Sequence, residues 1–501
     1  MQMTAAETDA IVARHVAPVG KILIDGVFEN SASGQTLPVY NPADGREIAQ
    51  LQAGSTADVD AAVAAARRSF EAGTWRNLPA PRQAEILWKL SQLIEDRLED
   101  LATLESIDCG MPIVRTRVHV RRGIEALRYY AGMCTKLHGQ TSSLRGDGVD
   151  FHAFTSPEPV GVAALITPWN GPLLVVCNKV APALAAGCSV VIKPPEQASL
   201  SALEFGRLAL DAGVPPGVIN IVTGLGREAG QALADHPDVN KISFTGSTAV
   251  GKALVTAAAG NLKRLCLELG GKSPIFVFDD ADMAQTIPTL FRAMFANSGQ
   301  VCVAGSRIYV QRRSLDRVAS GLKAIAARTR LGAGHDPSTE LGPLISKEHK
   351  ARVLGYIESG KAEGAELIHG GGAPAGGGYF VEPTIFLNAT ANMKMIQEEI
   401  FGPVMNLMVF DTLDEVAAIG NNSVYGLGAG VFTTNLDVAH TAARRLHAGN
   451  VWVNCYGIMD YSMPFGGFKE SGWGRENGFD GVNAFLEPKS VYIAIQQADA
   501  R

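Results

Sequence analysis

The residue best suited to covalent chemistry in this sequence is Cys302. It lies in the glycine-containing segment 297–307, among small residues and directly after a helix-like run. A thiolate is a strong nucleophile, and small neighbours would give an electrophilic substrate access to it. The alternative is an inert buried cysteine, which is the more common role of a lone cysteine. Cys177 and Cys188 lie in a helix-like run and at the start of a strand-like run, so we expect both in the core.

A glycine turn after a strand-like run predicts phosphate binding elsewhere in the chain. The run 241–244 leads into Gly246 and Ser247, and an Ala-rich helix-like segment follows. The first turn of a helix has unpaired backbone N–H groups and the positive end of the helix dipole, so a pyrophosphate could bind there with Ser247 as the helix cap. The spacing departs from the G-x-G-x-x-G fingerprint, however, and an ordinary strand-to-helix turn has a similar sequence.

Two acidic residues are candidates for binding the ribose of a nucleotide. Glu268 lies about twenty residues beyond the glycine turn, where the dinucleotide fingerprint has its acidic residue. Lys193 and Glu196 follow the strand-like run 189–192, so they would lie at the carboxyl end of a strand. Its place at the end of a strand makes Glu196 the better candidate for the ribose ligand. The alternative is that Lys193 and Glu196 belong to a solvated charged loop with no ligand. No metal site is indicated, because the ten histidines are scattered and no Cys/His cluster has zinc spacing.

The elements that must position these residues form an α/β pattern. Strand-like runs at 160–166, 189–192, 218–222 and 241–244 alternate with helix-like segments, which is typical of βαβ units and a parallel sheet. We predict a doubly wound sheet, whose ligands bind beyond the carboxyl ends of the strands. A second α/β pattern begins at 274–278, just after the Gly270-Gly271 pair, and continues to about residue 470.

The remaining segments indicate structure rather than chemistry. Residues 1–55 contain short apolar runs broken by Asn, Gly and Pro, so we predict strands and turns there. From Pro81 onward, apolar residues recur at three- and four-residue spacing, which predicts helices. The glycine-rich segment 370–378 is predicted to be a surface connection, and the alternating segment 488–496 a strand that pairs away from the main sheets.

Length, composition and charge exclude several classes of protein. The chain has 501 residues, of which 47% are apolar and 19% charged, as in a multidomain globular protein. Its net charge of −6 leaves no basic excess for a nucleic acid, and prolines in the long uncharged stretch 159–178 argue against a membrane span. Seven scattered cysteines without C-x-x-C indicate a reducing compartment, and the N-terminal residues lack the apolar core of a secretory signal. We therefore expect a cytoplasmic protein.

Four further stretches form an ordered set with the segment around Cys302. They are Pro168-Trp-Asn170, Glu268-Leu-Gly-Gly-Lys272, Glu398-Glu-Ile-Phe-Gly-Pro403 and the glycine-rich run from Pro464 to Glu476. In this order and at these separations, the set resembles the aldehyde dehydrogenase superfamily over about residues 20–496. The resemblance implies a doubly wound, Rossmann-like NAD-binding domain (1–140 and 159–270), an α/β catalytic domain (271–470) and a small β oligomerisation element (141–158 and 471–501). It also implies a homodimer or a homotetramer.

The resemblance implies that Cys302 attacks an aldehyde carbonyl to form a thiohemiacetal, which loses a hydride to the nicotinamide and leaves a thioester for hydrolysis. The Asn170 side-chain amide and the Cys302 backbone N–H would stabilise the oxyanion. Glu268 would be the general base rather than a ribose ligand, and its presence favours hydrolysis over acyl transfer to coenzyme A. Lys179 and Glu487 would form a pair used in proton relay, with a structural ion pair as the alternative.

Further residues are implied to bind the cofactor. Lys193 and Glu196 would bind the adenosine ribose, Ser247 the pyrophosphate and Glu399 the nicotinamide ribose, while Phe401 would lie against the nicotinamide. The other implied cofactor-binding residues are Ile166, Thr167, Trp169, Gly226, Phe244, Gly246 and Leu269. A carboxylate at position 196 suits the ribose diol and repels a 2′-phosphate, so NAD is favoured over NADP, although some family members with this acid accept both.

The residues implied to line the aldehyde tunnel are Gly171, Val175, Asn178, Ala296, Val301, Val303, Met459 and Phe465. Several family members have large aromatic residues where this chain has Gly171, Asn178 and Ala296. We therefore predict a wider tunnel and a bulky or long, largely neutral aldehyde. Asp460 could instead favour a cationic aminoaldehyde, but no clear aromatic cage accompanies it.

Several alternatives remain open at this point. The substrate could be a semialdehyde rather than a neutral aldehyde. The chain could be a non-catalytic binding or structural protein on the same fold, but such a protein should lack Cys302, Glu268 or Asn170, and all three are present. An esterase or thioesterase that uses Cys302 without a cofactor is the third alternative.

Overall fold

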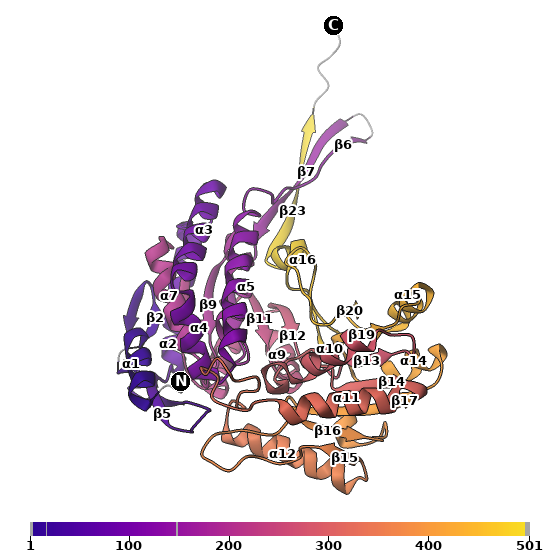
Figure 1. Cartoon of the computed structure of the whole chain (residues 1–501). Helices are drawn as coiled ribbons and strands as arrows, with labels where there is room; N and C mark the ends of the chain where they lie inside the picture. The colour runs from indigo at the N-terminus through magenta and orange to yellow at the C-terminus, as the bar shows by residue number, and fades with distance from the viewer. Residues whose placement is uncertain (1–3, 17, 147–148, 496–501) are drawn as a thin grey trace.

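The computed structural model describes residues 4–16, 18–146 and 149–495, and it has two large β-sheets covered by helices and a smaller sheet that projects from them (Figure 1). The α/β class predicted from the sequence is confirmed. The first large sheet has the order β22-β12-β11-β8-β9-β10-β2-β3. Its strands are β2 (Ile22–Ile24), β3 (Val27–Glu29), β8 (Val162–Ile166), β9 (Ser189–Lys193), β10 (Ile219–Ile221), β11 (Lys241–Thr245), β12 (Arg264–Glu268) and β22 (Gly472–Trp473).

The five central strands of this sheet, β8 to β12, are parallel. Numbered along the chain, they lie in the order 3-2-1-4-5, which is the predicted doubly wound arrangement. The order reverses between β8 and β11, and ligands of such sheets bind at this point, beyond the carboxyl ends of the strands. The residues that directly follow β8 and β11 are therefore placed to form a binding crevice.

Helices cover both faces of the first sheet because successive strand residues point into two different cores. Ala163 and Leu165 pack with α3 to α7, whereas Val162 and Ala164 pack with α2, α8 and α9. Cys177 and Cys188 are buried in the first of these cores, as predicted. The helices of this unit are α2 (Thr56–Ala72), α3 (Ala80–Asp96), α4 (Leu98–Cys109), α5 (Ile113–Ala131), α6 (Pro172–Ala185), α7 (Leu200–Ala212), η1 (Gly226–Gly230), α8 (Gln231–Asp235) and α9 (Thr248–Ala258).

The chain passes from β12 to the second sheet through residues 269–273, which contain Gly270 and Gly271. This sheet has the order β15-β16-β17-β14-β13-β19-β20 and is parallel except for β15. Helices α10 and α11 cover one face, and α12 to α15 cover the other. The strands are β13 (Pro274–Val277), β14 (Arg307–Gln311), β15 (Glu366–His369), β16 (Thr384–Leu387), β17 (Val404–Phe410), β19 (Gly428–Phe432) and β20 (Asn450–Val453). The helices are α10 (Met283–Phe295), η2 (Ala296–Gly299), η3 (Arg312–Ser314), α11 (Leu315–Arg328), α12 (Lys347–Ala362), α13 (Lys394–Gln397), α14 (Leu413–Gly420) and α15 (Leu436–Arg445).

A three-stranded antiparallel sheet extends away from the body of the molecule, at the top of Figure 1. It consists of β6 (Thr141–Gly146), β7 (Val149–Pro159) and β23 (Leu486–Ile495). The predicted strand at 488–496 is thus confirmed, apart from residue 496, which lies outside the described residues. Residues just before β23 return to the first unit, because β22 pairs with β12 and α16 (Gly478–Asn483) packs against α6. The smallest sheets combine β1 (Val19–Gly20), β4 (Thr36–Tyr40) and β5 (Glu47–Gln52), and β18 (Tyr425–Gly426) and β21 (Phe468–Lys469).

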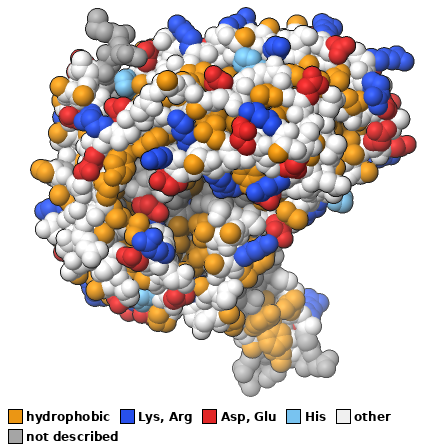
Figure 2. All heavy atoms as spheres, turned by 90° about the horizontal axis from the view of Figure 1, so that it is seen from below, with side chains coloured by type: hydrophobic (Ala, Val, Ile, Leu, Met, Phe, Trp, Pro, Cys, Tyr) orange, Lys and Arg blue, Asp and Glu red, His pale blue; other side chains and the backbone are white. Residues whose placement is uncertain are grey.

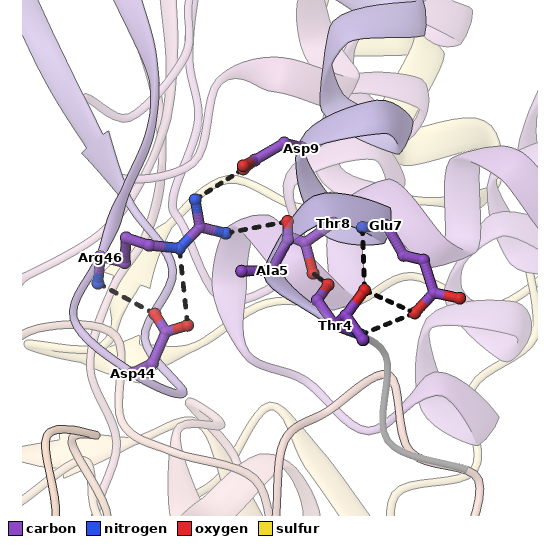
Figure 3. Close-up of polar contacts among 7 residues, drawn as sticks. All are labelled: Thr4, Ala5, Glu7, Thr8, Asp9, Asp44 and Arg46. Atoms are coloured by element: carbon purple, nitrogen blue, oxygen red, sulfur yellow. Dashed lines mark hydrogen bonds and ion pairs between the residues drawn. The ribbon is translucent and has the colours of Figure 1, made fainter.

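The prediction of strands and turns for residues 1–55 is wrong at α1 (Ala5–His15). The helix begins with a capping box, in which Thr4 Oγ1 accepts from the Glu7 backbone N–H at 3.3 Å and Glu7 Oε2 accepts from the Thr4 N–H at 2.7 Å (Figure 3). Arg46 donates to Asp9 at 2.6 Å and to the Ala5 carbonyl at 3.4 Å, which attaches the helix to the turn before β5. The Thr-x-x-Glu spacing was the signal for this helix, and the apolar runs obscured it.

The surface seen from below is hollowed between two parts of the molecule (Figure 2). Lys, Arg, Asp and Glu side chains lie around this hollow, and apolar side chains line part of it. Among the residues that the structure describes, no helix is long and apolar enough to cross a membrane.

Candidate active site

Cys302 lies on a turn that follows α10. Within η2, Asn297 and Ser298 have positive φ angles of 48° and 56°, so the chain leaves the helical path there. Gln300 fixes the turn, because its side chain donates to the Asn297 carbonyl at 3.1 Å and accepts from the Ile345 N–H at 3.0 Å. Cys302 itself is half-buried. The turn therefore holds the cysteine in a defined place without enclosing it completely.

The surroundings of Cys302 are tightly packed on both sides. A Cβ atom on Gly271 would lie 2.4 Å from the Cys302 carbonyl oxygen, so no larger residue fits at position 271 without a shift of the backbone. On the other side, Val301, Val303 and Phe465 join Cys302 in one hydrophobic cluster. The structure thus places three of the predicted tunnel residues in the same hydrophobic cluster as the candidate nucleophile.

The Cys302 thiol needs a base to become a nucleophile. Burial raises its pKa to about 12, with smaller contributions from the nearby carboxylates of Glu399 and Glu268. At neutral pH the thiol is therefore protonated, although the thiolate is the reactive form. A carboxylate close to the cysteine could remove this proton.

Glu268 has the properties of such a base. It ends β12 and is only 4% exposed, yet neither carboxylate oxygen has a hydrogen-bond partner among the described residues. Burial raises the pKa of Glu268 well above its usual value, Glu476 raises it further, and Lys179 and Arg475 oppose this effect. A raised pKa makes the ionised carboxylate a stronger base than an exposed glutamate.

Glu268 and Cys302 border the same short segment. A Cβ atom on Gly466 would lie 2.8 Å from Glu268 Oε1, and Phe465, the preceding residue, packs against the same hydrophobic cluster as Cys302. The glycine therefore leaves room for the carboxylate beside the cysteine cluster.

Asn170 is fixed to the same turn as Cys302. It lies beyond the carboxyl end of β8, and its Nδ2 donates to the Gln300 carbonyl at 2.9 Å. Asn297 Nδ2 in turn donates to the Asn170 carbonyl at 3.4 Å. Two segments that are far apart in sequence are thereby joined, and the amide of Asn170 is brought to the nucleophile turn.

Lys179 is completely buried on α6 and forms an ion pair with Glu476. Its Nζ also donates to Ser243 Oγ on β11 at 2.9 Å. Glu476 is held by two backbone hydrogen bonds to Phe465, at 2.7 and 2.8 Å. The ion pair thus lies next to the segment that contacts both Glu268 and Cys302.

The predicted pairing of Lys179 with Glu487 is wrong. Glu487 lies on β23 and pairs with Arg264 at 2.6 Å, and both side chains are about half exposed at 48% and 54%. The carboxylate that meets Lys179 comes instead from the loop between β22 and α16. Glu487 is therefore part of a surface ion pair at the base of the small sheet.

The predicted phosphate turn lies at the carboxyl end of β11. Ser247 caps α9, because its Oγ accepts from the Val250 N–H at 3.4 Å, and Ser247 is exposed. A Cβ atom on Gly246 would lie 2.4 Å from the Phe244 ring, so a larger residue fits there only if this ring moves. Leu269 is buried under Gly251 of α9 and supports this helix from below. An exposed helix N-terminus of this kind can bind a phosphate group.

Lys193 and Glu196 form an ion pair of 3.0 Å at the end of β9. Lys193 is buried, while about a third of the Glu196 side chain is exposed, so the carboxylate can meet a ligand. The adjacent end of β8 is joined to this strand by a hydrogen bond from Thr167 N–H to the Lys193 carbonyl at 3.2 Å. Ile166 lies just before Thr167, and Gly226 starts η1 on an open surface.

Glu399 and Phe401 lie on the loop between α13 and β17. Glu399 Oε1 accepts from the Gly271 N–H at 3.0 Å, and burial raises the Glu399 pKa to about 7. Phe401 has a φ of 60° and packs edge to face on Trp169, with ring centroids 5.2 Å apart. Glu399, Phe401, Gly271 and Val301 line one cavity. The predicted nicotinamide-end residues are thus close to the turn that bears Cys302.

The remaining predicted tunnel residues lie on α6, near η2 and on the segment after β20. Gly171 precedes α6, and a Cβ atom there would lie 3.5 Å from His119 and 3.9 Å from Val175. Asn178 Oδ1 accepts from the Tyr461 hydroxyl at 2.9 Å. Ala296 ends α10, and Met459 is half-buried beside Asp460.

Sequence reasoning missed the roles of three residues in this network. Glu476 was seen only as the end of a glycine-rich motif, although it is the partner of Lys179. Gln300 fixes the nucleophile turn, and Tyr456 donates to the Val303 carbonyl at 2.7 Å next to Cys302. Gln300 lies in the segment 297–307 around Cys302, but its hydrogen bond to Ile345 joins distant parts of the chain and cannot be predicted from the local sequence.

The chain matches the model of the aldehyde dehydrogenase family over residues 28–491. It belongs to this family. Retinal dehydrogenase 2 from Homo sapiens is 46% identical over 484 residues, which are 96% of this chain and 93% of that protein. The NAD+ complex of aldehyde dehydrogenase from Bacillus cereus has a TM-score of 0.95 and 42% identity, and the match covers 99% of both chains. Betaine aldehyde dehydrogenase from Staphylococcus aureus has a TM-score of 0.93 and 36% identity, covering 96% of this chain and 95% of that one.

The predictions of the family and of the α/β fold are confirmed. The roles of the individual residues in this aldehyde dehydrogenase stay predictions that rest on the geometry above. Among the described residues, no group of three or more His, Cys, Asp or Glu side chains is arranged to hold a metal ion.

Proposed function

We propose that this enzyme oxidises a long or bulky aldehyde to the carboxylic acid with NAD+, through a thioester on Cys302. The observation that carries the proposal is the buried carboxylate of Glu268, which has no hydrogen-bond partner among the described residues and borders the same 465–466 segment as Cys302. Burial of an unpaired carboxylate destabilises the fold, so a carboxylate that is nevertheless buried and unpaired in a cleft is a candidate for a catalytic role that uses its basicity.

In the first half of the reaction, Glu268 takes the proton of the Cys302 thiol. The thiolate adds to the aldehyde carbonyl and forms a thiohemiacetal, and the carbonyl oxygen becomes an oxyanion. The Asn170 amide and the Cys302 backbone N–H donate to this oxyanion. When bound, NAD+ supplies the hydride acceptor that converts the thiohemiacetal to a thioester.

Before the second half, Glu268 releases the thiol proton to solvent. It then takes a proton from water as the water attacks the thioester. The carbon–sulfur bond breaks, the carboxylic acid leaves and Glu268 returns its proton to the Cys302 thiolate. Lys179 and Glu476 act through Glu268: they set the charge around the carboxylate, so we class them as positioning residues.

The residues at the carboxyl ends of β8, β9 and β11 fit a dinucleotide. The exposed cap of α9 at Ser247 offers backbone N–H groups to the pyrophosphate. Glu196 would accept hydrogen bonds from the adenosine ribose, and Glu399 from the nicotinamide ribose. Glu196 is charged and adjacent to a single lysine, which disfavours the 2′-phosphate of NADP without abolishing its binding.

The substrate is proposed to be long or bulky because small residues occupy the tunnel beside Cys302. Gly171 and Ala296 have small side chains where several family members have aromatic ones, and Val175, Val301 and Val303 are uncharged. The neutral part of the substrate lies in this section. Related enzymes bear the names of retinal and betaine aldehyde, so the family as such does not fix the substrate.

Assembly and location follow from further observations. The small sheet exposes apolar side chains at Leu144, Tyr492, Ile493 and Ile495, which supports a homodimer or a homotetramer that covers them. All seven cysteines are free, which supports a reducing compartment, and we propose the cytoplasm.

The experiment is NADH formation at 340 nm with a panel of aldehydes, using wild type, Cys302→Ala and Glu268→Gln. Cys302→Ala should abolish NADH formation. Glu268→Gln should slow both the formation and the hydrolysis of the thioester, so that turnover is low and any acyl group formed stays on the chain, as measured by mass spectrometry. Cys134→Ala, which removes a buried cysteine outside the site, is the matched control and should remain active. NADH formation that persists in Cys302→Ala would refute the proposal, as would ester hydrolysis by an enzyme that reduces no cofactor.

A further inference from the structure

Three arginines and a histidine gather beside the predicted tunnel. Arg115, His119 and Arg122 recur on α5 at spacings of four and three residues, so they lie on one face of the helix. Arg292 approaches them from α10. Burial lowers the pKa of Arg115, and the charges of Arg122 and Arg292 lower it further.

This group, here called the arginine cluster, borders the tunnel residues through His119 and Tyr461. A Cβ atom on Gly171 would lie 3.5 Å from His119 Nδ1, so the imidazole forms the wall at that point. Arg122 lies 5.8 Å from the ring centre of Tyr461, whose hydroxyl is hydrogen-bonded to Asn178 at 2.9 Å.

Arg292, the fourth residue of the cluster, is connected through its backbone to the start of η2. Arg292 accepts a hydrogen bond at its carbonyl from the N–H of Ala296, which places Arg292 one helical turn before that tunnel residue. The cluster therefore borders Gly171 through His119 and Asn178 through Tyr461, two positions where the chain has a small side chain or an amide instead of a large aromatic one.

The chain balances the positive charge of the cluster only in part, because Asp460 interacts with the charge of Arg122 without forming an ion pair. Among the described residues, no carboxylate lies within ion-pair distance of Arg115, Arg122 or Arg292, although Asp460 and Glu125 are exposed nearby. Asp460 instead accepts from the Ser462 N–H and hydroxyl at 2.8 and 2.6 Å.

His119 adds no charge to the cluster. Burial lowers its pKa to about 3, and the charges of Arg115 and Arg122 contribute to this. Its Nδ1 has no hydrogen-bond partner among the described residues. At neutral pH the tunnel therefore has a neutral imidazole in its wall and guanidinium groups around it.

We infer that the preferred substrate is an aldehyde with a carboxylate at its far end, an ω-oxo carboxylic acid, which the arginine cluster binds while the aldehyde lies at Cys302. The inference rests on the proposed function and names its substrate class. A guanidinium group can bind a carboxylate through two parallel hydrogen bonds, and a cleft with one sign of charge concentrates ligands of the opposite sign. The middle of such a substrate is neutral, as the uncharged walls near Cys302 require.

The test compares two substrates that share the aldehyde and the carbon chain and differ at the far end, which is a carboxylate in one and a neutral methyl ester in the other. Initial rates of NADH formation are measured with 6-oxohexanoate and with its methyl ester, for wild type, Arg115→Gln, Arg122→Gln and Arg292→Gln. Wild type should prefer the carboxylate in kcat/KM by about tenfold or more, and each variant should reduce this preference by about threefold to tenfold, mainly through KM. Arg122→Lys, which keeps the charge, should restore part of the preference.

Arg121→Gln is the matched control, because Arg121 is exposed on another face of the same helix and the same charge is removed. It should leave the preference unchanged. Two results would overturn the inference: equal kcat/KM for the acid and the ester in wild type, or an equal loss of preference in Arg121→Gln and in the cluster variants. In either case, Cys302-dependent oxidation of the ester would still support the proposed function. If neither compound nor any other aldehyde is oxidised, the proposed function fails and the inference fails with it.

Discussion

The ion pair between Lys179 and Glu476 should control the pH dependence of turnover, with opposite shifts for the two partners. Lys179 lowers the pKa of Glu268 and Glu476 raises it. The base must be ionised to act, so activity rises with pH through the pKa of Glu268. Lys179→Met should therefore move the acidic limb of the kcat profile to higher pH, and Glu476→Gln should move it to lower pH.

The size of these shifts follows from the sheet. Lys179 Nζ lies 2.9 Å from Ser243 Oγ, and Ser243 is in register with Cys266, two residues before Glu268. Two residues of a strand span about 7 Å. A unit charge at about 7 Å in an effective dielectric of about 20 contributes about 2 kcal/mol, or between one and two pKa units.

The assay is kcat against pH from NADH formation at saturating aldehyde and NAD+, well below the melting temperature of each variant. Breaking a buried ion pair destabilises a protein by about 3–5 kcal/mol, so melting curves must show that both variants are folded at the assay temperature. The electrostatic explanation is refuted if the two folded variants shift in the same direction, or if neither limb moves by more than a few tenths of a unit.

Three further predictions concern separate parts of the molecule. Gly271→Ala should lower kcat by about 100-fold, because its Cβ would lie 2.4 Å from the Cys302 carbonyl oxygen, whereas Gly355→Ala, with no atom within 4 Å, should not. Glu196→Gln should raise kcat/KM for NADP by about tenfold relative to NAD, since the repulsion of the 2′-phosphate is removed; an unchanged cofactor ratio would contradict the assigned ribose site. Burial raises the pKa of Glu105 from 4.5 to about 7. The folded state therefore holds a proton that the unfolded chain releases, and the free energy of unfolding falls by about 3 kcal/mol as the pH rises from 4.5 through 7. Glu105→Gln should flatten the dependence of Tm on pH between 5 and 8, and an unaltered slope would show that Glu105 does not cause it.

Much of the fold could be predicted because its signals are local. The β-branched runs at 160–166 and 241–244 became β8 and β11, since residues of a parallel strand buried on both faces are continuously apolar. The doubly wound order also followed from the alternation of strands and helices. The helix α1 was missed because its capping box, rather than its apolar periodicity, indicates where it starts.

The site was predictable where one motif supplies one residue, and not where two distant segments must meet. Cys302, Glu268 and Asn170 each lie in a recognisable stretch, and the structure gathers them. The partner of Lys179 lies 297 residues away, and both Glu476 and Glu487 follow the same glycine-rich run. Sequence spacing cannot decide between them, because the choice depends on how the loop after β22 folds back against α6.

This folding back explains how Glu268 keeps a free carboxylate in the interior. A direct pair with Lys179 would lower the pKa of Glu268 and make it a weaker base. Instead, Glu476 and Ser243 engage the Lys179 ammonium, while Gly466 leaves space beside Glu268 Oε1. The lysine is thus close enough to limit the rise in pKa but already occupied. The strand register, the glycine and the long-range ion pair together maintain one unpaired base beside the cysteine.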